Sequence, residues 1–457
     1  MSTQAEPTIN TALIEKDFGI LTNDPAVQKR ALAICEEFKY SYECWNDLDS
    51  FMESSQRPKM VLAHITNPDG PIKASEMGQL VRSFTTESFL VCITRNILGK
   101  EEAAFSKKSG CDLVLMEDEV IKTGKLEFVC TQILRSQYIP IKPSDLTINT
   151  TITFDLFHLL PMRGKFLRFA HAGDFFDEKK FAKSKLVGEF YIERDSSPNY
   201  NKYIQETADK SAAGLEKRCR SEFLNLFSEF SQLAFQLTNQ SEHASFGDGQ
   251  KLLNQCTQAC KKLIETLGES GQAWRIINNS SIGEFGSLER APAVASYSGL
   301  FALQIGMNKI ELIMLSALLT DLGLLFISPT VLRKIRELNM MGFTYDERVE
   351  YERYPSLSLD IILNRKLSIP ENQRSWIVAT QETADGKGFP KKLTGLQAPK
   401  EARLISFCRE FDRRTLIRMG QLRQDPQDVL KKMLLDSPEL ITVFGEDLIN
   451  DLKPLVQ

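Results

Sequence analysis

The first residue of chemical interest is an aspartate in an otherwise apolar stretch. Asp321 lies within IELIMLSALLTDLGLLFI (310–327), whose apolar periodicity predicts a helix. A buried carboxylate without a partner is energetically costly or takes up a proton, so Asp321 requires a partner. Further along, ADGKGFP (384–390) carries two glycines and a proline, which specify a tight loop with unusual backbone angles. These two segments are the first candidates for a functional site.

Histidine, the commonest nitrogen ligand of protein-bound metals, is scarce in this chain. The sequence of 457 residues contains four histidines, His64, His158, His171 and His243. None lies beyond His243, so metal ligation by imidazole is excluded throughout the C-terminal half. His158 and His171 stand among phenylalanines, where packing is favoured over metal ligation.

The cysteine pattern predicts reduced, buried thiols. Nine cysteines, an odd number, are scattered from Cys35 to Cys408 and are mostly flanked by apolar residues, as is typical of a cytoplasmic protein. Cys256 and Cys260 are four residues apart and share a helix face. No further cysteine or histidine stands near them, so a buried pair is favoured over a zinc site.

Composition excludes several classes of protein. The 56 basic and 60 acidic residues give a net charge of −4, which does not suit a protein that binds nucleic acid polymers. No apolar run approaches the roughly 20 residues of a membrane helix, and the N-terminus lacks a secretory signal. We therefore expect a cytoplasmic chain without membrane association. At about 100–200 residues per domain, its length predicts about three domains.

Residues 1–136 show short apolar runs that alternate with helical stretches. Five βα units of about 22 residues imply a doubly wound α/β fold with a parallel sheet covered on both faces. In such folds ligands bind at the carboxyl ends of the strands. The expected strands are 18–21, 40–44, 59–65, 89–94 and 112–116, and the expected helices are 25–38, 45–55, 74–84, 98–109 and 121–136.

In layout, this segment resembles a response-regulator receiver domain. A receiver holds magnesium with acidic residues after its first strand, and this chain keeps one of them, Asp24. The position of the phosphoryl-accepting aspartate holds His64, Thr94 matches the hydroxyl that ends strand four, and Glu117 replaces the lysine. One carboxylate is a poor magnesium site, and Glu117 would repel a phosphate. The resemblance therefore implies a pseudo-receiver that docks partners, favoured over phosphorylation of His64.

The middle of the chain connects two larger parts. Residues 137–206 are rich in β-branched and aromatic residues and predict a small β-containing module. Residues 207–283 predict linker helices with an apolar stripe of Phe223, Leu226, Phe230, Leu233 and Leu237. The stripe indicates either a homodimer through helices 207–240 or a helix that covers the core of the next domain, and the two are about equally favoured.

Residues 284–424 carry four motifs in order over about 130 residues. They are LLTDLG (318–323), RYPSL (353–357), TQETADGKGFP (380–390) and ARLISFCREFD (402–412). Together these segments resemble an HD-GYP domain, a metal-dependent phosphodiesterase family that hydrolyses cyclic di-GMP. The resemblance implies an all-α domain with two or three metal ions held by His, Asp and Glu side chains.

At the positions that this resemblance assigns to metal ligands, most ligands are missing. Asp321 and Glu382 are retained, and the signature tyrosine is Phe389. The substituted ligand positions are Arg290, Thr320, Tyr354, Thr380, Gln381 and Arg409. Arginine keeps its charge in proteins, so two of these positions hold fixed positive charges. We therefore expect no metal and no cofactor, and we expect Asp321 to pair with Arg409 or Arg290.

These features give three readings of function. The favoured one is a catalytically inactive HD-GYP-type signalling protein of the bacterial cyclic di-GMP and two-component class, which acts as a scaffold for protein partners. The alternative is a sensor that binds cyclic di-GMP without metal or hydrolysis, and the remote alternative is an active phosphodiesterase. Residues 425–457 predict a helical tail broken near Ser437-Pro438. Candidate ligand-binding residues are Asp321, Glu382, Asp385, Lys387, Phe389, Arg403 and Arg409.

Overall fold

A computed structural model describes most of the chain, which falls into two compact units. One unit comprises residues 1–134 with 239–244, and the other comprises residues 135–238 with 245–457. The described residues are 16–54, 58–64, 71–86, 88–95, 108–134, 137–160, 165–184, 187–238, 246–269, 273–280, 287–337, 340–415 and 425–456. The expected helix 98–109 lies almost entirely outside them, as does His243.

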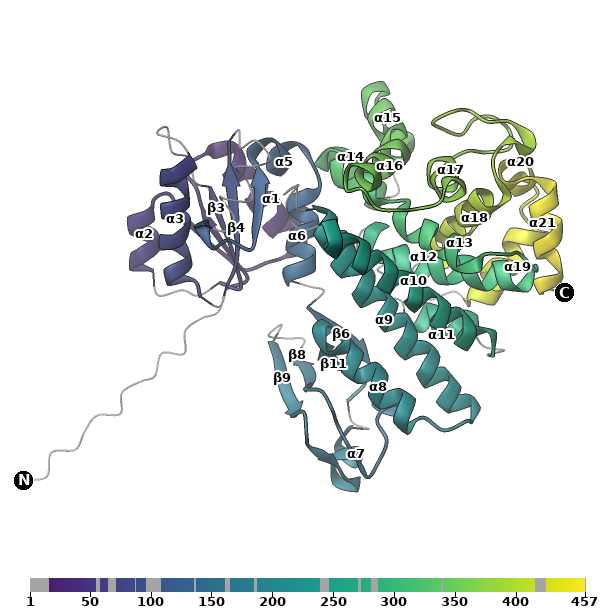
Figure 1. The fold of residues 1–457 in the computed structure, drawn as a ribbon, viewed down its shortest axis with the longest axis horizontal. Coiled ribbons are helices and arrows are strands. Elements are labelled where there is room, and N and C mark those ends of the chain that lie inside the picture. The colour runs from purple at the N-terminus through teal and green to yellow at the C-terminus, as the bar shows by residue number, and fades with distance from the viewer. Residues whose placement is uncertain are drawn as a thin grey trace, which may run out of the picture. The chain divides into compact units, whose positions relative to one another are not determined.

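The first unit is built on a parallel five-stranded sheet in the order β2-β1-β3-β4-β5. This confirms the expected doubly wound α/β fold. Helices α2 and α3 cover one face, and α1, α5 and α6 cover the other (Figure 1). The strands are β1 (Phe18–Leu21), β2 (Tyr42–Trp45), β3 (Met60–His64), β4 (Phe89–Thr94) and β5 (Leu113–Met116), and the helices are α1 (Pro25–Phe38), α2 (Leu48–Glu53), α3 (Pro71–Phe84), α5 (Glu117–Lys122) and α6 (Lys125–Leu134).

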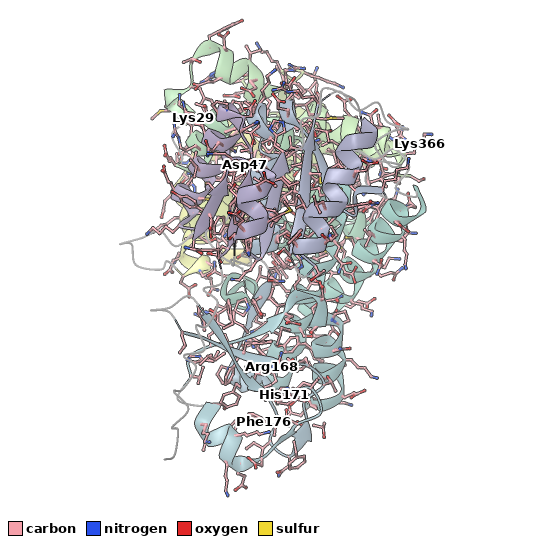
Figure 2. The ribbon with its side chains drawn as sticks, turned by 90° about the vertical axis from the view of Figure 1, so that its left-hand side faces the viewer. Lys29, Asp47, Arg168, His171, Phe176 and Lys366 are labelled. Atoms are coloured by element: carbon pink, nitrogen blue, oxygen red, sulfur yellow. The ribbon has the colours of Figure 1, made fainter. Side chains whose placement is uncertain are left out.

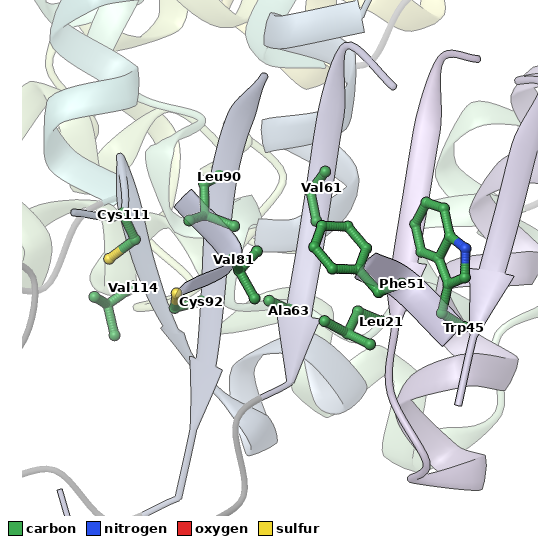
Figure 3. Packing of buried hydrophobic residues seen from close by; sticks show 10 residues of the cluster. All are labelled: Leu21, Trp45, Phe51, Val61, Ala63, Val81, Leu90, Cys92, Cys111 and Val114. Atoms are coloured by element: carbon green, nitrogen blue, oxygen red, sulfur yellow. The ribbon is translucent and has the colours of Figure 1, made fainter. Parts of the chain in front are cut away.

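The strands of this sheet are apolar because both of their faces are buried. Every residue of β1 and β3 is buried, as expected for a covered parallel sheet. On the face under α2 and α3, Trp45, Phe51 and Val81 pack over strand residues such as Val61 (Figure 3). A Cβ at Gly19 would meet the Trp45 ring at 2.7 Å, so glycine at this strand position makes room for the indole.

One expected helix of this unit is wrong. The sequence predicts a single helix over 121–136, but α5 begins directly after β5 at Glu117 and ends at Lys122. Glu119 accepts a hydrogen bond from the backbone N–H of Met116 at 3.0 Å, which fixes the start of α5. The chain then turns at Thr123-Gly124 before α6, because glycine is a poor helix former.

The second unit begins with the expected β-containing module. Four antiparallel strands pair in the order β6-β11-β8-β9, and a separate pair joins β7 to β10. Arg168 and His171 lie near each other at the edge of this module, with Arg168 Nη1 3.4 Å from His171 Nδ1 (Figure 2). The elements are β6 (Tyr138–Ile141), β7 (Thr150–Thr151), β8 (Leu156–Leu160), β9 (Lys165–Ala170), β10 (Phe175–Phe176), α7 (Glu178–Ser184) and β11 (Phe190–Glu193).

The linker helices α8 (Ser197–Thr207), α9 (Ala212–Thr238) and α10 (Phe246–Gly268) pack within the unit. The apolar stripe of α9 is buried along its whole length. Helix α9 contacts α8, α10, α11 and α12, so the stripe covers a core inside this chain. That packing favours a helix that covers the core of the next domain. The homodimer through helices 207–240 stays a prediction, but the apolar stripe no longer supports it.

The rest of the unit is helical, as expected. Among the described residues, no helix is both long and apolar enough to span a membrane. The tail breaks at Ser437-Pro438 as predicted, but it breaks again at Gly445, whose φ is 89°, and so forms three short helices rather than two. The elements are α11 (Ala273–Ser280), α12 (Ser287–Gln304), α13 (Ile310–Leu319), the 3-10 helix η3 (Leu322–Phe326), α14 (Pro329–Arg336), α15 (Tyr345–Glu352), α16 (Tyr354–Asn364), α17 (Glu371–Ala379), α18 (Lys400–Thr415), α19 (Pro426–Leu435), α20 (Glu439–Phe444) and α21 (Glu446–Leu452).

Candidate functional site

The buried aspartate that the sequence singles out has an arginine as its partner. Asp321 lies between α13 and η3, and its Oδ1 is 2.8 Å from Nη1 of Arg409 on α18. This confirms one of the two expected pairings. Burial raises the pKa of Asp321, and the charge of Arg409 opposes that rise without cancelling it. Burial alone would lower the pKa of Arg409, but Asp321 and the neighbouring tyrosines raise it, so the guanidinium remains charged.

Tyr354 completes this cluster from the start of α16. Arg409 Nη1 donates a hydrogen bond to the Tyr354 hydroxyl at 2.7 Å, and the guanidinium lies 5.7 Å from the centre of the ring. Tyr354 is fully buried, with Tyr351 and Phe389 at centroid distances of 5.2 and 6.2 Å. One guanidinium therefore contacts a carboxylate, a hydroxyl and an aromatic face, which leaves little of its charge without compensation.

A second buried ion pair lies between α12 and α18. Arg290 donates from Nε to Asp412 Oδ2 at 2.6 Å, and its Nη2 also contacts the other carboxylate oxygen. This bidentate geometry is the strongest arrangement of arginine with a carboxylate. Asp412 was not predicted as the partner of Arg290, although it stands three residues after Arg409 and therefore on a neighbouring face of the same helix. Arg290 consequently does not pair with Asp321.

The threonines at two substituted ligand positions serve their own helices. The Thr320 hydroxyl donates to the Ala317 carbonyl at 3.0 Å, and the Thr380 hydroxyl donates to the Ile377 carbonyl at 3.0 Å. Both side chains are buried. Gln381 is half-buried, and its backbone carbonyl accepts a hydrogen bond from Phe389 N–H at 3.1 Å. The two threonine hydroxyls therefore stabilise the ends of α13 and α17, and the Gln381 carbonyl stabilises the start of the glycine-rich loop. All three residues stabilise local structure at positions that the resemblance assigns to metal ligands.

The retained glutamate organises the glycine-rich loop. Glu382 is buried, and its two oxygens accept hydrogen bonds from the backbone N–H groups of Lys391 at 2.6 Å and Leu393 at 2.8 Å. A Cβ at Gly388 would overlap the backbone around Glu382, so only glycine allows this close approach. Both oxygens of the Glu382 carboxylate are thus engaged in hydrogen bonds that hold the loop in its fold.

Three further candidate residues divide between the loop surface and the tail. Asp385 accepts hydrogen bonds from Thr383 and from Lys387 N–H, and the exposed Lys387 ammonium lies 3.1 Å from it. Arg403 instead donates to the Phe444 carbonyl at 2.8 Å and pairs with Asp447 at 2.6 Å. Its buried guanidinium therefore holds the tail on α18, and a role of Arg403 in ligand binding stays a prediction.

The four positions that correspond to receiver residues gather in the first unit. Asp24, His64, Thr94 and Glu117 lie at or beyond the carboxyl ends of β1, β3, β4 and β5, as the sequence predicts. The Thr94 hydroxyl contacts the Met116 sulfur at 3.7 Å. Arg95, which the sequence analysis did not single out, pairs with both Asp24 and Glu117.

The residues present at the ligand positions do not fit a metal cluster. Two of them are arginines in buried ion pairs, and two are threonines bonded within their own helices. In the described part of the chain, no group of three His, Cys, Asp or Glu side chains is arranged to hold a metal ion.

Comparison with known proteins identifies the helical region. Residues 253–438 match the family model described as "HD domain", so this region contains an HD domain. The cyclic di-GMP phosphodiesterase response regulator RpfG of Xanthomonas campestris pv. campestris (strain 8004) is 29% identical over 165 residues, 36% of this chain. The match covers 41% of that relative. A solved structure described as Bd1817, a HDG"Y"P protein from Bdellovibrio bacteriovorus, aligns at 18% identity with a TM-score of 0.44, covering 70% of this chain and 99% of that one.

Proposed function

We propose that this chain is a catalytically inactive signalling protein of the HD-GYP type that works as a scaffold for protein partners. The observation that carries the proposal is the pair of buried ion pairs, Asp321 with Arg409 and Arg290 with Asp412. Three of these four residues, Arg290, Asp321 and Arg409, stand at positions where the resemblance assigns metal ligands. The relative that is named a cyclic di-GMP phosphodiesterase response regulator supports a place in cyclic di-GMP signalling.

The energetic argument concerns what a metal would have to displace. Breaking a buried ion pair by removing one partner typically costs about 3–5 kcal/mol, because it leaves a charge without compensation. A metal at Asp321 would have to break such a pair and then remain beside a charged guanidinium. Arginine does not lose its proton in proteins, so the repulsion cannot be relieved by titration.

The receiver-like unit supports the same reading. Its sheet presents His64 where a receiver has the phosphoryl-accepting aspartate, and the imidazole is buried. We propose that this pseudo-receiver contributes a docking surface and receives no phosphoryl group. A regulatory scaffold of this kind is expected to act in the cytoplasm through protein contacts.

The test of catalytic silence uses the full chain with cyclic di-GMP. Purified protein is incubated with the dinucleotide in the presence of Mn²⁺ or Fe²⁺, and product is followed by chromatography while bound metal is measured by elemental analysis. We expect no turnover above a heat-treated sample and no stoichiometric metal. Turnover or a stoichiometric metal content overturns the proposal in favour of an active phosphodiesterase.

A second candidate function is a sensor that binds cyclic di-GMP without cutting it. The observation in its favour is that the Lys387 side chain is 85% exposed and stands two residues before the half-buried Phe389, so one loop offers a cation and a ring to a nucleotide. Calorimetric titration with cyclic di-GMP separates the two functions. If the wild-type protein gives heat of binding and Lys387→Ala does not, the sensor function is supported. If the wild-type protein gives no heat, the scaffold function is favoured.

A further inference from the structure

One short helix of the second unit exposes its apolar side chains. Helix α15 stands beside α16 (Figure 1). Tyr345 at its first position is 81% exposed, and Val349, one turn later, is 43% exposed. Met341, shortly before the helix, is 98% exposed. Single apolar residues are common on protein surfaces, but three of them so close together indicate an interaction surface.

The polar side chains of α15 face inward instead. Glu347 lies 2.7 Å from the ammonium of Lys334 on α14. Glu350 accepts hydrogen bonds from the backbone N–H of Ser328 at 2.6 Å and from its hydroxyl at 2.9 Å. Tyr351 packs into the apolar cluster beneath the helix. At about 3.6 residues per turn, these residues share one side of α15 and the exposed apolar residues lie on the other, the reverse of an ordinary surface helix.

Two opposite charges complete this outer face. Asp346 and Arg353 are both exposed, and in the described part of the chain neither side chain forms an ion pair. Asp346 stands three residues before Val349 and Arg353 four residues after it, so all three share one face. The outer face is therefore negative at its N-terminal end, apolar in the middle and positive at its C-terminal end. Such a face is complementary to a copy of itself that runs in the opposite direction.

We propose that the outer face of α15 is a dimer interface, in which the α15 helices of two copies of this chain pack antiparallel around Val349. With a rise of about 1.5 Å per residue, Asp346 lies about 4.5 Å before Val349 along the axis and Arg353 about 6 Å after it. The two-fold axis then brings Arg353 of each copy beside Asp346 and Tyr345 of the other. There the guanidinium pairs with a carboxylate and lies against a ring. This inference goes beyond the scaffold function, because self-association requires no other protein.

The charges favour a second copy in this orientation over other occupants. A parallel pair would set Asp346 against Asp346 and Arg353 against Arg353, which repel each other. A uniformly acidic or basic partner would match only one end of the face. Helix α15 has eight residues, so the interface is small and the dimer is expected to be weak and dependent on concentration.

The experiment measures the self-association of the full chain by sedimentation velocity over a wide range of concentrations. We expect wild type to show a monomer–dimer equilibrium. Asp346→Arg and Arg353→Asp each set like charges opposite each other at both ends of the antiparallel pair. Each variant is therefore expected to raise the dissociation constant by roughly tenfold or more.

An equal mixture of the two variants makes the assignment specific. In a heterodimer of Asp346→Arg with Arg353→Asp, opposite charges again meet at both ends, so the mixture is expected to associate about as tightly as wild type. The matched control is Lys261→Glu, which reverses an exposed charge on α10 and is expected to leave the dissociation constant unchanged.

Three outcomes overturn the proposal. The first is a wild-type chain that stays monomeric at every concentration. The second is a dimer that both single variants leave intact, which would place the interface elsewhere, such as on helices 207–240. The third is a mixture that associates no better than its components. Circular dichroism confirms that each variant is folded.

Discussion

Two of the regions in which arginines pair with carboxylates differ in burial, namely the cluster on α12 and α18 and the carboxyl edge of the parallel sheet. Arg409 and Arg290 have side chains that are 19% and 10% exposed, whereas Arg95 is 57% exposed. The buried arginines are enclosed by aromatic rings and helices, and no solvent replaces them if they are lost. The exposed arginine lies at the carboxyl edge of the sheet, where water can reach it. Ion pairs of the same chemistry are therefore buried in the helical unit and exposed at the edge of the receiver-like sheet.

This difference in burial predicts a ranking of effects. A charge that is left uncompensated in the interior costs much more than one that water can reach, because the interior screens charge poorly. Variants that break an ion pair of the helical unit should thus lose more stability when the pair is more deeply buried and its hydrogen bonds are better aligned. Variants at the exposed sheet edge should lose less stability.

The largest effect is expected for Arg290→Met. The change leaves the Asp412 carboxylate buried without its bidentate partner, and we expect the free energy of unfolding of the helical unit to fall by about 3–5 kcal/mol. Urea unfolding followed by far-ultraviolet circular dichroism measures it. Arg290→Met with Asp412→Leu is the matched control, because removing both charges should restore most of the loss. Wild-type stability in the single variant would show that the pair does not hold α12 to α18.

A smaller loss is expected for Asp321→Asn. Arg409 then loses its carboxylate but keeps the Tyr354 hydroxyl and ring, so the free energy of unfolding should fall by about 1–3 kcal/mol. Tyr354→Phe, which removes only the hydroxyl, should cost less than Asp321→Asn. Differential scanning calorimetry of both variants measures which of them loses more stability. An unchanged melting temperature in Asp321→Asn contradicts the pairing.

The outcome at Asp321 shows how far sequence reasoning reaches in this domain. A lone carboxylate among leucines requires a cation, and the motif order placed Arg409 and Arg290 within reach, so the partner could be narrowed to two residues. Asp412 could not be chosen in the same way, because α18 carries several charged residues and only the packing of α12 against it selects one. The ion pair of Arg403 was not predicted for a related reason. Its true partner, Asp447, lies in the tail that the motifs do not cover.

The fold of the first unit was more accessible to sequence reasoning than its edge chemistry. Strands buried on both faces are apolar along their whole length, and the five runs gave all five strands within a few residues. The separation of α5 from α6 was missed, because Thr123-Gly124 is a short break inside a helical pattern. Arg95 was missed because it matches no receiver position, and its ion pairs follow only from the fact that β4 ends at the same edge of the sheet as β1 and β5.

The stability of the receiver-like unit is expected to depend on pH through His64. Burial lowers the pKa of His64 below its usual 6.5, and Glu117 and Asp24 oppose that shift without cancelling it. His64 therefore binds a proton more readily in the unfolded chain than in the folded unit. Its contribution to the free energy of unfolding is fully present above pH 6.5 and is lost as the pH falls below that value. Thermal unfolding between pH 7.5 and 5 measures the effect. His64→Gln should flatten the profile, and His171→Gln in the other unit should not; equal slopes in all three proteins would exclude His64 as the cause.

The smallest effect on stability is expected for Arg95→Ala. Each partner of Arg95 keeps another anchor, Asp24 at the start of α1 and Glu117 at the start of α5, and water can reach the two half-buried carboxylates once the exposed arginine is removed. The melting temperature should therefore change much less than in Asp321→Asn. The small change should also disappear in 0.5 M NaCl, because salt screens exposed pairs more than buried ones. A loss as large as that of Arg290→Met, or one that persists in salt, would mean that Arg95 supports the fold in the same way as the buried arginines, and the distinction between the two regions would then fail.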